Sequence, residues 1–404
     1  MSVDLRPKLT RNQIKGVDFA LKEFRERPQR EGADFNRELK TLNELRKYPH
    51  RHIVTHLATW TQDGKYYMLF PYAQCNLRQY MKWLHFGPAT KDNIMWLLNQ
   101  LRGLAEALKD IHNLSSIGPS LPTPTPAPNL AAPQQPQMRK SGWHHDLKPE
   151  NILLFKCSGH GRGTFQISDF GSGKIHTYRS GSVNTRSAIG TVTYEPPEAQ
   201  TEGATSRPHD MWSLGCVFLE LLIWAVLDCQ AVDSFASERV DRRYPGSQTY
   251  LAEDDSYWQK AESGGITLRK QVLDWIERLK SKVQKQRQQP FMEVLELIIK
   301  MLDPDRYTRI LALDLWNTLE QICYQKNLDL QDSQDDCEPE SNNHDPSSDL
   351  PRLSLSPPDR TFFHNEMLSF GPNAGSVTGD SFTLSPSDLR TSRPNSSGSV
   401  VFPK

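Results

Sequence analysis

Ser141-Gly-Trp-His-His-Asp-Leu-Lys-Pro-Glu-Asn-Ile-Leu-Leu154 is the stretch that decides the fold of this chain, and Ile167-Ser-Asp-Phe-Gly171 follows it. The first stretch places an aspartate, a lysine and an asparagine at positions 146, 148 and 151, and the second places an aspartate directly before Phe-Gly. Apolar residues of strand type flank both stretches. One such stretch alone is usually a polar turn between strands. Two in this order favour a site that handles metal-bound phosphate.

The two stretches resemble the catalytic loop and the Asp-Phe-Gly element of the protein kinases. The family's catalytic loop reads His-Arg-Asp-Leu-x-x-x-Asn, and in this chain His145 stands in the place of the arginine. The resemblance implies that Asp146 is the catalytic base for the substrate hydroxyl and that Lys148 contacts the transferred phosphate. It also implies that Asn151 and Asp169 are the ligands of magnesium.

The N-terminal part supplies a lysine and a glutamate by the same resemblance. The alternating stretch Val17-Asp-Phe-Ala-Leu-Lys-Glu-Phe24 predicts a half-buried strand, and the apolar spacing over 34–46 predicts a helix with Asp34 as its N-cap. Lys22 is similar to the kinase lysine that holds the α- and β-phosphates of ATP, and Glu38 is similar to its ion-pair partner. Either residue alone would more often be a surface charge, whereas their order ahead of the two motif aspartates favours the pair.

The resemblance also assigns an adenine slot. Ala20 and Leu153 would form its roof and floor. Phe70 falls at the gatekeeper position, where a bulky side chain closes the back pocket. Pro71 to Ala73 falls at the hinge, where backbone groups are expected to pair with adenine.

Gly190-Thr-Val-Thr-Tyr-Glu-Pro-Pro-Glu198 resembles the end of a kinase activation segment, with Pro-Pro-Glu in place of Ala-Pro-Glu. Thr191 matches the threonine that bridges the catalytic aspartate and lysine in serine/threonine kinases. Glu198 and Arg309 stand in the right order for a buried ion pair between this segment and the helical lobe. Asp210 matches the residue that fixes the backbone of the catalytic loop.

Two features depart from the family pattern. The first is His145, which removes the permanent cation that would pair with a phosphorylated activation loop. A histidine is mostly uncharged near neutral pH, so we expect activity that depends little on loop phosphorylation. Candidate sites for modification remain in that loop at Ser180, Ser182, Thr185 and Ser187.

The second departure concerns the glycine-rich loop, Gly-x-Gly-x-x-Gly-x-Val, which covers the phosphates in the family. Before Lys22 this chain has only Gly16. We therefore expect the first strand and the loop to be absent. Two explanations stay open: an N-terminally incomplete sequence of a working kinase, or a natural kinase fold with an uncovered nucleotide site.

We expect an α+β, two-lobed protein-kinase-like fold. Its parts are a truncated N-lobe at 1–71, with an incomplete antiparallel sheet plus a helix, and a mainly helical C-lobe at 72–327. The C-lobe carries a Pro-rich insertion at 114–140 and a surface insertion at 229–265. From 328 to 404 Asp, Ser, Pro and Asn dominate without periodicity, which predicts a disordered tail. Apolar periodicity and turn signals predict further strands at 52–54, 58–60 and 66–70 and helices at 91–113, 207–224, 267–282, 291–302 and 310–325.

Composition limits the partners and the compartment. The formal net charge is zero, so nothing favours a nucleic acid or a membrane surface as a partner. No apolar run reaches the roughly 18 residues of a membrane span, and the N-terminus has no signal-peptide pattern. Six scattered cysteines without a Cys-x-x-Cys pair fit an intracellular location, cytoplasmic or nuclear, and disfavour structural zinc.

The Pro-rich insertion contains Pro119-Ser-Leu-Pro122, which has the PxxP form of SH3 or WW ligands. A bare polyproline spacer is the more frequent meaning of such a stretch. Ser356-Pro357 and Ser385-Pro386 have the form of proline-directed phosphorylation sites, although chance explains such pairs in so Ser/Pro-rich a tail.

The resemblance covers residues 17 to about 325, and 67–78 is similar to the hinges of fungal kinase-domain proteins. It implies a protein serine/threonine kinase that uses ATP and magnesium and acts on a protein substrate. A pseudokinase that acts as a scaffold through its insertion and tail is the alternative from another class. A small-molecule phosphotransferase is a third possibility, disfavoured by Thr191 and the Pro-Pro-Glu segment.

Overall fold

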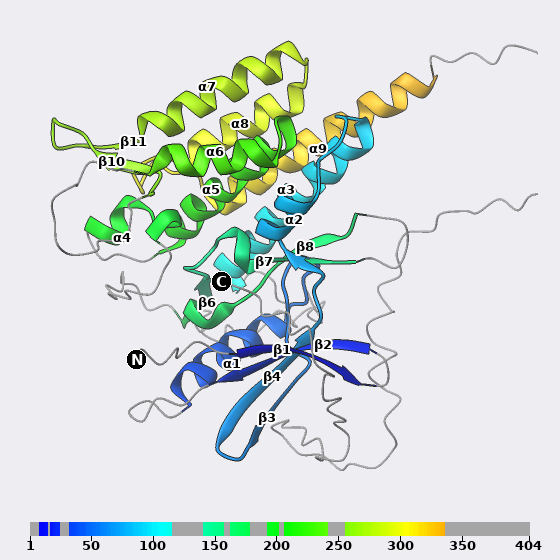
Figure 1. Ribbon diagram of the computed structural model, residues 1–404, viewed down its shortest axis with the longest axis vertical. Coiled ribbons are helices and arrows are strands. Elements are labelled where there is room, and N and C mark those ends of the chain that lie inside the picture. The colour runs from blue at the N-terminus through cyan, green and yellow to red at the C-terminus, as the bar shows by residue number, and fades with distance from the viewer. Residues whose placement is uncertain are drawn as a thin grey trace, which may run out of the picture.

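The computed structural model has two lobes, with a small sheet and one helix forming the lower lobe and a helical bundle forming the upper lobe (Figure 1). This mixed α+β architecture is the expected fold class. Eight ranges of the chain are described: 8–14, 17–24, 32–114, 140–156, 162–177, 192–201, 206–240 and 255–335. Most of the Pro-rich insertion and of the C-terminal tail lies outside these ranges.

The lower lobe is an antiparallel sheet in the order β1-β2-β4-β3. Phe35 of the lobe's helix packs against Phe24 of β2 and Tyr66 of β4, with ring centroids 5.4 Å and 4.8 Å apart, so the helix is fixed to the sheet by aromatic contacts. The elements of this lobe are β1 (Lys8–Ile14), β2 (Val17–Phe24), α1 (Ala33–Arg46), β3 (Ala58–Gln62) and β4 (Lys65–Pro71).

The hairpin between β3 and β4 turns at Asp63 and Gly64, whose φ angles of 51° and 71° are those of a type I′ turn. The Asp-Gly sequence predicts this turn. Strand β1 is an addition to the expected elements, and it pairs with β2 from Lys8 opposite Glu23 to Ile14 opposite Val17. Its sequence, Lys-Leu-Thr-Arg-Asn-Gln-Ile, lacks the alternation that would identify a strand.

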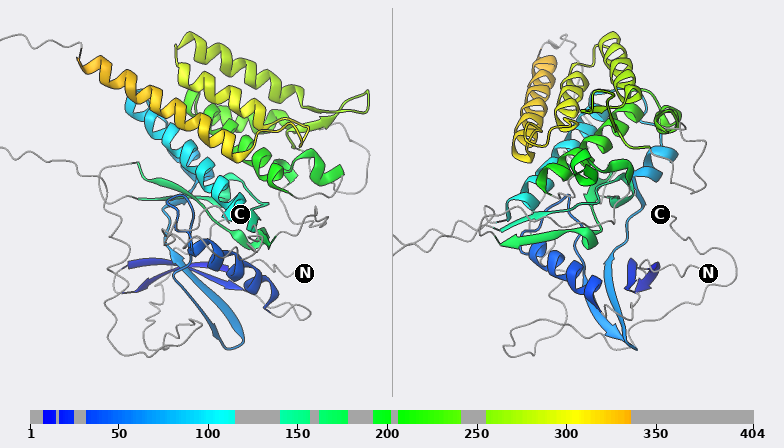
Figure 2. Two further views of the ribbon diagram at one scale, coloured as in Figure 1. Left: turned by 180° about the vertical axis from the view of Figure 1, so that it is seen from behind. Right: turned by 90° about the vertical axis from the view of Figure 1, so that its left-hand side faces the viewer.

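Helix α5 lies inside the upper lobe, and α3, α6, α7 and α8 pack around it (Figure 2). Helix α5 is buried along nearly its whole length, as its uniformly apolar sequence predicts. Helix α9 runs beside α3 in both views. The helices of this lobe are α2 (Leu77–Trp83), α3 (Lys91–His112), α4 (Pro197–Thr201), α5 (Arg207–Val226), α6 (Cys229–Arg239), α7 (Lys270–Lys285), α8 (Gln289–Met301) and α9 (Ala312–Asp335).

Short strands and 3-10 turns lie between the lobes and carry the motif residues at their ends. The strands form one sheet in the order β5-β7-β8 and one pair, β6-β9; a further hairpin, β10-β11, lies at the edge of the upper lobe. These elements are β5 (Cys75–Asn76), β6 (Lys140–Trp143), β7 (Ile152–Phe155), β8 (Thr164–Ile167), β9 (Lys174–Thr177), β10 (Trp258–Lys260), β11 (Ile266–Leu268), η2 (Pro149–Asn151), η3 (Phe170–Ser172) and η4 (Val192–Tyr194).

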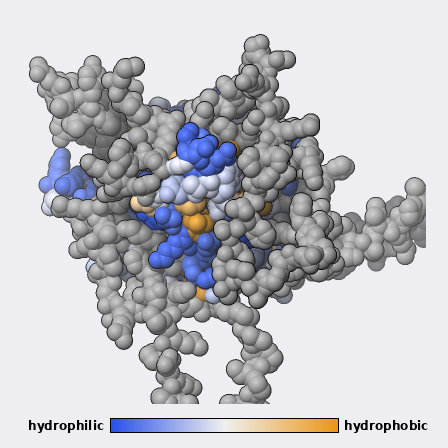
Figure 3. Space-filling view, turned by 90° about the horizontal axis from the view of Figure 1, so that it is seen from below, coloured by the Kyte–Doolittle hydropathy of each residue, from blue (hydrophilic) through white to orange (hydrophobic). Residues whose placement is uncertain are grey.

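One described helix, α5, is long and apolar enough to cross a membrane by length and composition, with a mean hydropathy of 1.3. Inside the domain 94% of that stretch is buried, which is the behaviour of a core helix. On the face seen from below, the coloured surface is mostly hydrophilic and surrounds a small apolar strip (Figure 3).

The segment expected as a surface insertion, 229–265, contributes several side chains to the core in its described parts, although most of its described residues are exposed or half-buried. Phe235 of α6 and Tyr257 are fully buried, and the guanidinium of Arg239 lies over both rings at 4.1 Å and 4.2 Å. Buried aromatic residues at isolated positions produce no helical or strand periodicity in the sequence. Periodicity therefore cannot predict their burial. Residues 241–254 lie outside the described ranges.

Three boundaries also differ from expectation. Helix α1 has Gly32 as its N-cap, with a φ of 65°, and Asp34 lies in the first turn, where it accepts a hydrogen bond from Arg37. The expected strand at 52–54 is a single bridge between Ile53 and Ile167. Helix α9 continues to Asp335, past the limit at which we expected the folded part to end.

Candidate active site

Lys22, Glu38 and Asp169 form an ion cluster between the lobes. The ammonium of Lys22 donates to both carboxylate oxygens of Glu38, at 2.7 Å and 2.8 Å, and to Asp169 Oδ1 at 2.9 Å. Lys22 and Glu38 are buried, whereas the Asp169 side chain is 39% exposed. Burial alone would lower the pKa of Lys22, but the charges of Asp169 and Glu38 outweigh it and hold this pKa above its usual value.

The backbone around Asp169 directs this carboxylate toward the lysine. Asp169 has a φ of 62°, in the left-handed region, and Phe170 is fully buried with its ring edge-on to the His144 ring at 4.9 Å. The next residue, Gly171, has no side chain to crowd Glu38. A Cβ at this position would lie 3.1 Å from Glu38 Oε2, one of the two oxygens that bind Lys22. Packing of Phe170 therefore fixes the position of the preceding aspartate.

Asp146, Lys148 and Asn151 form a second cluster on the loop before β7. The Lys148 ammonium donates to both Asp146 oxygens, at 2.8 Å and 3.0 Å. The amide nitrogen of Asn151 donates to the Asp146 backbone carbonyl at 2.7 Å and to its carboxylate at 3.0 Å. The carboxylate of Asp146 is thus fixed by its own loop, in a part-buried position.

Asp210 of α5, which is fully buried, holds the backbone of this loop through hydrogen bonds. Its carboxylate accepts from the backbone N–H groups of His144 and His145, both at 2.8 Å, and lies 3.0 Å from His112 Nε2. Burial alone would raise the pKa of Asp210, but the hydrogen bond to His112 and the neighbouring histidines lower it well below its usual value. The aspartate therefore stays ionised and secures His145 at a φ of 69°.

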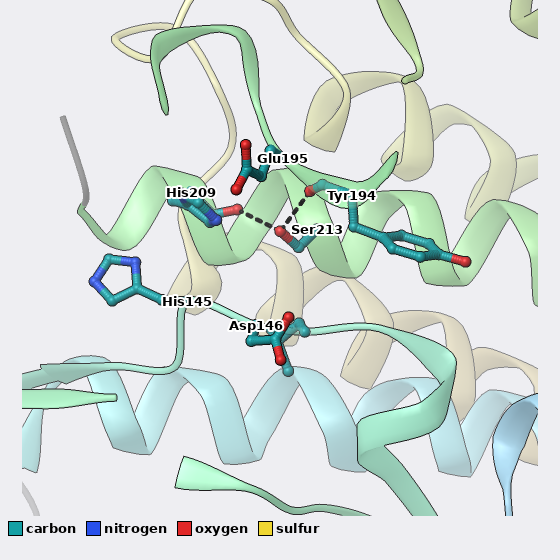
Figure 4. A pocket seen from close by; sticks show the side chains of 7 residues that line it. His145, Asp146, Tyr194, Glu195, His209 and Ser213 are labelled. Atoms are coloured by element: carbon teal, nitrogen blue, oxygen red, sulfur yellow. Dashed lines mark hydrogen bonds between the residues drawn. The ribbon is translucent and has the colours of Figure 1, made fainter. Parts of the chain in front are cut away.

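A narrow pocket lies beside Asp146, between the catalytic-type loop and the start of α5 (Figure 4). The His145 ring stands edge-on to the ring of His209 at 5.2 Å. Ser213 closes the far side by donating to the backbone carbonyl of Tyr194 at 2.8 Å. Seven residues line the pocket: His145, Asp146, Leu147, Tyr194, Glu195, His209 and Ser213.

Glu195 is a pocket residue that the sequence reasoning did not single out. Burial raises the pKa of its carboxyl group, and burial lowers the pKa of the neighbouring His209 ring. The position follows directly on Tyr194 in the Gly-Thr-Val-Thr-Tyr-Glu stretch, but a single glutamate in a loop gives no pattern that would identify it.

Glu198 and Arg309 form a buried bidentate ion pair at 2.7 Å and 3.0 Å. Arg309 also donates to the Pro208 carbonyl at 2.7 Å. The pair ties α4, directly after the 192–196 segment, to the loop before α9, as the order of the two residues led us to expect.

The residues assigned to an adenine slot lie on β2, on β4 and the connection that follows it, and on β7. Ala20 pairs with Phe70 across β2 and β4 in the lower lobe, and Leu153 lies on β7 of the upper lobe. The connection between the lobes is fastened by a hydrogen bond from the Gln74 N–H to the Leu154 carbonyl at 2.9 Å. The five residues of this set are all half-buried: Ala20, Phe70, Pro71, Ala73 and Leu153.

Thr191 and the serines and threonines of the preceding loop lie outside the described ranges. Within those ranges, no group of three His, Cys, Asp or Glu side chains is arranged to hold a metal ion alone. Magnesium in phosphoryl-transfer sites takes only one or two protein ligands and is completed by phosphates and water. Asn151, whose Nδ2 is used as a donor, and the part-exposed Asp169 fit that limited role.

Part of the chain is similar to known protein kinases. Residues 139–319 match the family model of the protein kinase domain. The chain is 40% identical over 79 residues to human 3-phosphoinositide-dependent protein kinase 1, a match that covers 20% of this chain and 13% of that protein. It is 38% identical over 86 residues to cyclin-dependent kinase 4 of Ovis aries, covering 21% and 26%.

A longer match is 29% identical over 217 residues to the probable cyclin-dependent kinase 8 of Dictyostelium discoideum, covering 50% of this chain and 47% of that protein. The chain thus matches less than half the length of each of these curated relatives. The family match extends from the loop that holds Asp146 to helix α9, and the two-lobed fold sets Lys22 and Glu38 against it. Residues 139–319 are thus similar to a eukaryotic-type protein kinase domain.

Proposed function

We propose that this chain is a protein serine/threonine kinase that transfers the γ-phosphate of ATP to a hydroxyl group of a protein substrate. The observation that carries the proposal is the ion cluster in which Lys22 contacts Glu38 and Asp169 at once. Lys22 is buried 2.9 Å from the part-exposed Asp169, and burying this charge costs desolvation free energy. The stability of the fold does not require such a cost. A nucleotide phosphate with its cation would use both groups.

Lys22 would bind the phosphates, because its ammonium has three donors and Glu38 fixes its position. Asn151 and Asp169 would hold magnesium, which supplies charge neutralisation on the phosphate oxygens. The adenine ring would lie between Ala20 and Leu153.

Asp146 would orient the acceptor hydroxyl and accept its proton. Its carboxylate is already held by Lys148 and Asn151, so little reorganisation is needed when a substrate arrives. Lys148 would stay beside the transferred phosphate, where its charge counts most in the transition state. Thr191, in the place typical of serine/threonine kinases, supports a serine or threonine acceptor, and an intracellular protein substrate fits the cysteine usage.

The test is transfer of labelled phosphate from ATP with magnesium to a generic basic protein and to the chain itself. Asp146→Asn and Asp169→Asn should each reduce incorporation by about a hundredfold or more, since each removes a charge that acts on the reacting groups. Asp314→Asn is the matched control, because Asp314 is an exposed aspartate in the first turn of α9. It should leave incorporation unchanged.

Incorporation that persists in both site variants would contradict the proposal. No incorporation by the folded chain would also contradict it and favour a pseudokinase scaffold. A thermal-shift titration with ATP and magnesium would then separate a scaffold that binds nucleotide from one that does not. Lys22→Met should abolish any such shift, because it removes the phosphate ligand.

A further inference from the structure

Arg78, on helix α2, has three partners from three other elements. Its Nε donates to Glu150 Oε1 of η2 at 3.2 Å, and its Nη1 lies 2.9 Å from Glu220 Oε2 of α5. Its Nη2 donates to the hydroxyl of Tyr194 on η4. The planar guanidinium thus uses each of its three nitrogens on a different part of the site.

The centre of this cluster is Glu220, whose side chain is 1% exposed. Its Oε1 accepts from the Tyr194 hydroxyl at 3.0 Å and from the Tyr257 hydroxyl at 2.9 Å, while Oε2 faces Arg78. The charges of Glu220 and Glu150 together with the hydroxyl of Tyr194 raise the pKa of Arg78, although burial alone would lower it. A second cation, Arg239, lies 3.8 Å from Glu220 Oε1, so Arg78 is the nearer of the two cations that balance this buried carboxylate.

Two of the three partners of Arg78, Glu150 and Tyr194, lie on the two segments that would enclose a substrate. Glu150 lies between Lys148 and Asn151, in the turn that fixes Asp146. Tyr194 lies within the stretch that resembles the end of an activation segment, and it precedes Glu195 of the pocket. Arg78 is therefore placed to set the distance between the catalytic loop and the 192–196 segment.

The helix that carries Arg78, α2, is fixed at its start by side-chain hydrogen bonds. A capping box closes the start of α2, with the Gln79 N–H donating to Asn76 Oδ1 at 2.9 Å and the Asn76 N–H donating to Gln79 Oε1 at 3.2 Å. Asn76 also pairs with Leu153 through β5 and β7. The guanidinium is thus anchored to the same small sheet from which the catalytic loop emerges.

We propose that Arg78 is a positioning residue that couples the catalytic loop to the 192–196 segment through Glu150, Glu220 and Tyr194. This inference rests on the proposed kinase function for its effect on turnover. The physical coupling of the two segments can be measured without turnover. Arg78 contacts neither of the two groups, Asp146 and Lys22, that would touch the acceptor and the phosphates, so its effect on catalysis is indirect.

The first measurement is backbone amide hydrogen exchange in Arg78→Ala. Peptides covering 144–154 and 192–201 should both exchange about tenfold faster, because the side chain that joins them is gone. Arg102→Ala is the matched control. Arg102 is likewise held in an ion pair, with Glu320 at 2.7 Å, and its side chain is 30% exposed against 32% for Arg78, but it joins α3 to α9. Arg102→Ala should leave both peptides unchanged.

The second measurement is steady-state phosphate transfer by the same variants. In Arg78→Ala, kcat/KM for the protein substrate should fall about tenfold or more while KM for ATP stays within about twofold, because the Lys22 cluster is untouched. Guanidinium ion at millimolar concentration should restore part of the loss, since it can enter the vacated site. The same concentration of urea should restore nothing. Arg78→Lys, which keeps the charge but has one nitrogen, should be intermediate.

The outcomes separate this inference from the proposed function. If the wild-type chain transfers no phosphate, the kinase proposal fails and hydrogen exchange still decides the coupling. If exchange is unchanged in Arg78→Ala, or increases equally in Arg102→Ala, the coupling is refuted. Where Arg78→Ala does not fold, Arg78→Lys takes its place, and exchange in this variant equal to the wild type in both segments would refute the coupling.

Discussion

His52 is a buried imidazole at the junction of the two lobes. Its Nδ1–H donates to the Phe165 carbonyl oxygen at a distance of 2.7 Å. Burial lowers its pKa from 6.5 to about 4. Between these two values the unfolded chain binds a proton that the folded chain does not, so the free energy of unfolding must decrease as the pH falls through this window.

The first prediction concerns this histidine. Lowering the pH from 7 to 4.5 should remove up to about 3 kcal/mol of stability through His52, the equivalent of its pKa shift. His52→Asn cannot take up that proton, so its free energy of unfolding should fall less over the same range. Urea denaturation at the two pH values measures both. His85→Asn, at an exposed histidine, is the control, and equal pH losses in both variants would contradict the prediction.

The Glu198–Arg309 pair gives the second prediction. Arg309 has a side chain with 0% exposure, so its removal leaves a buried carboxylate without its cation. Arg309→Ala should therefore lower the free energy of unfolding by about 3 to 5 kcal/mol. The surface pair of Lys280 with Glu277 offers a comparison. Lys280→Ala should change the free energy of unfolding by less than about 1 kcal/mol. Chemical denaturation measures both, and similar losses would refute the reasoning.

At the residue scale, spacing within a motif predicted the site residues that lie close together in the chain. Asp146, Lys148 and Asn151 share one loop, so their pattern is local. Arg78 could not be found in that way, because it meets Glu150 across 72 positions of sequence and carries no motif of its own. A lone arginine in the sequence gives no sign of the acidic partners that folding brings to it.

At the scale of elements, helices with a strong apolar stripe were predicted well. Helix α3 covers Lys91–His112 against an expected 91–113, because one face of it is core and the period is unmistakable. The short α2 was not expected, since its seven residues span only two turns. Strand β1 escaped for a related reason: its identity comes from pairing with β2 and not from its own sequence.

Close contact between α3 and the junction of the lobes gives the third prediction. A Cβ at Gly103 would lie 2.0 Å from Nε2 of the His52 ring, so this helix needs glycine although alanine is the better helix former. Gly103→Ala should lower the free energy of unfolding by about 1 to 3 kcal/mol.

A double-mutant cycle tests the cause of that loss. In a His52→Ala background the ring is absent, so Gly103→Ala should be neutral or stabilising by up to about 1 kcal/mol. Thermal or chemical unfolding of the four proteins gives the coupling free energy. Equal effects of Gly103→Ala in both backgrounds would show that something other than the His52 ring imposes the glycine.

At the scale of the whole molecule, the contacts that join the lobes include three at different places. Lys22 reaches Asp169 across the gap, and the Val54 N–H donates to the Ile167 carbonyl at 2.9 Å. The third contact is in the connection after β4, where the Gln74 N–H donates to the Leu154 carbonyl of β7. The first of these uses the same charges that would hold the nucleotide, so nucleotide binding and the arrangement of the lobes should be coupled.

The 192–196 segment is held by side chains of the upper lobe. Thr193 Oγ1 donates to Asp255 at 2.6 Å, and the Trp258 indole donates to the Glu195 carbonyl at 3.2 Å. His145, in the place of the family's arginine, packs edge-on against the rings of Trp143 and His209. None of these contacts requires a phosphate group.

The fourth prediction follows from this arrangement. Phosphatase-treated chain should transfer phosphate at a rate within about threefold of untreated chain, because the described contacts around the 192–196 segment are complete without modification. Asp255→Ala removes the acceptor for Thr193 and should lower the rate in treated and untreated protein alike. A tenfold loss on dephosphorylation of the wild type would mean that the loop before Val192, and not the upper lobe, sets the position of the segment.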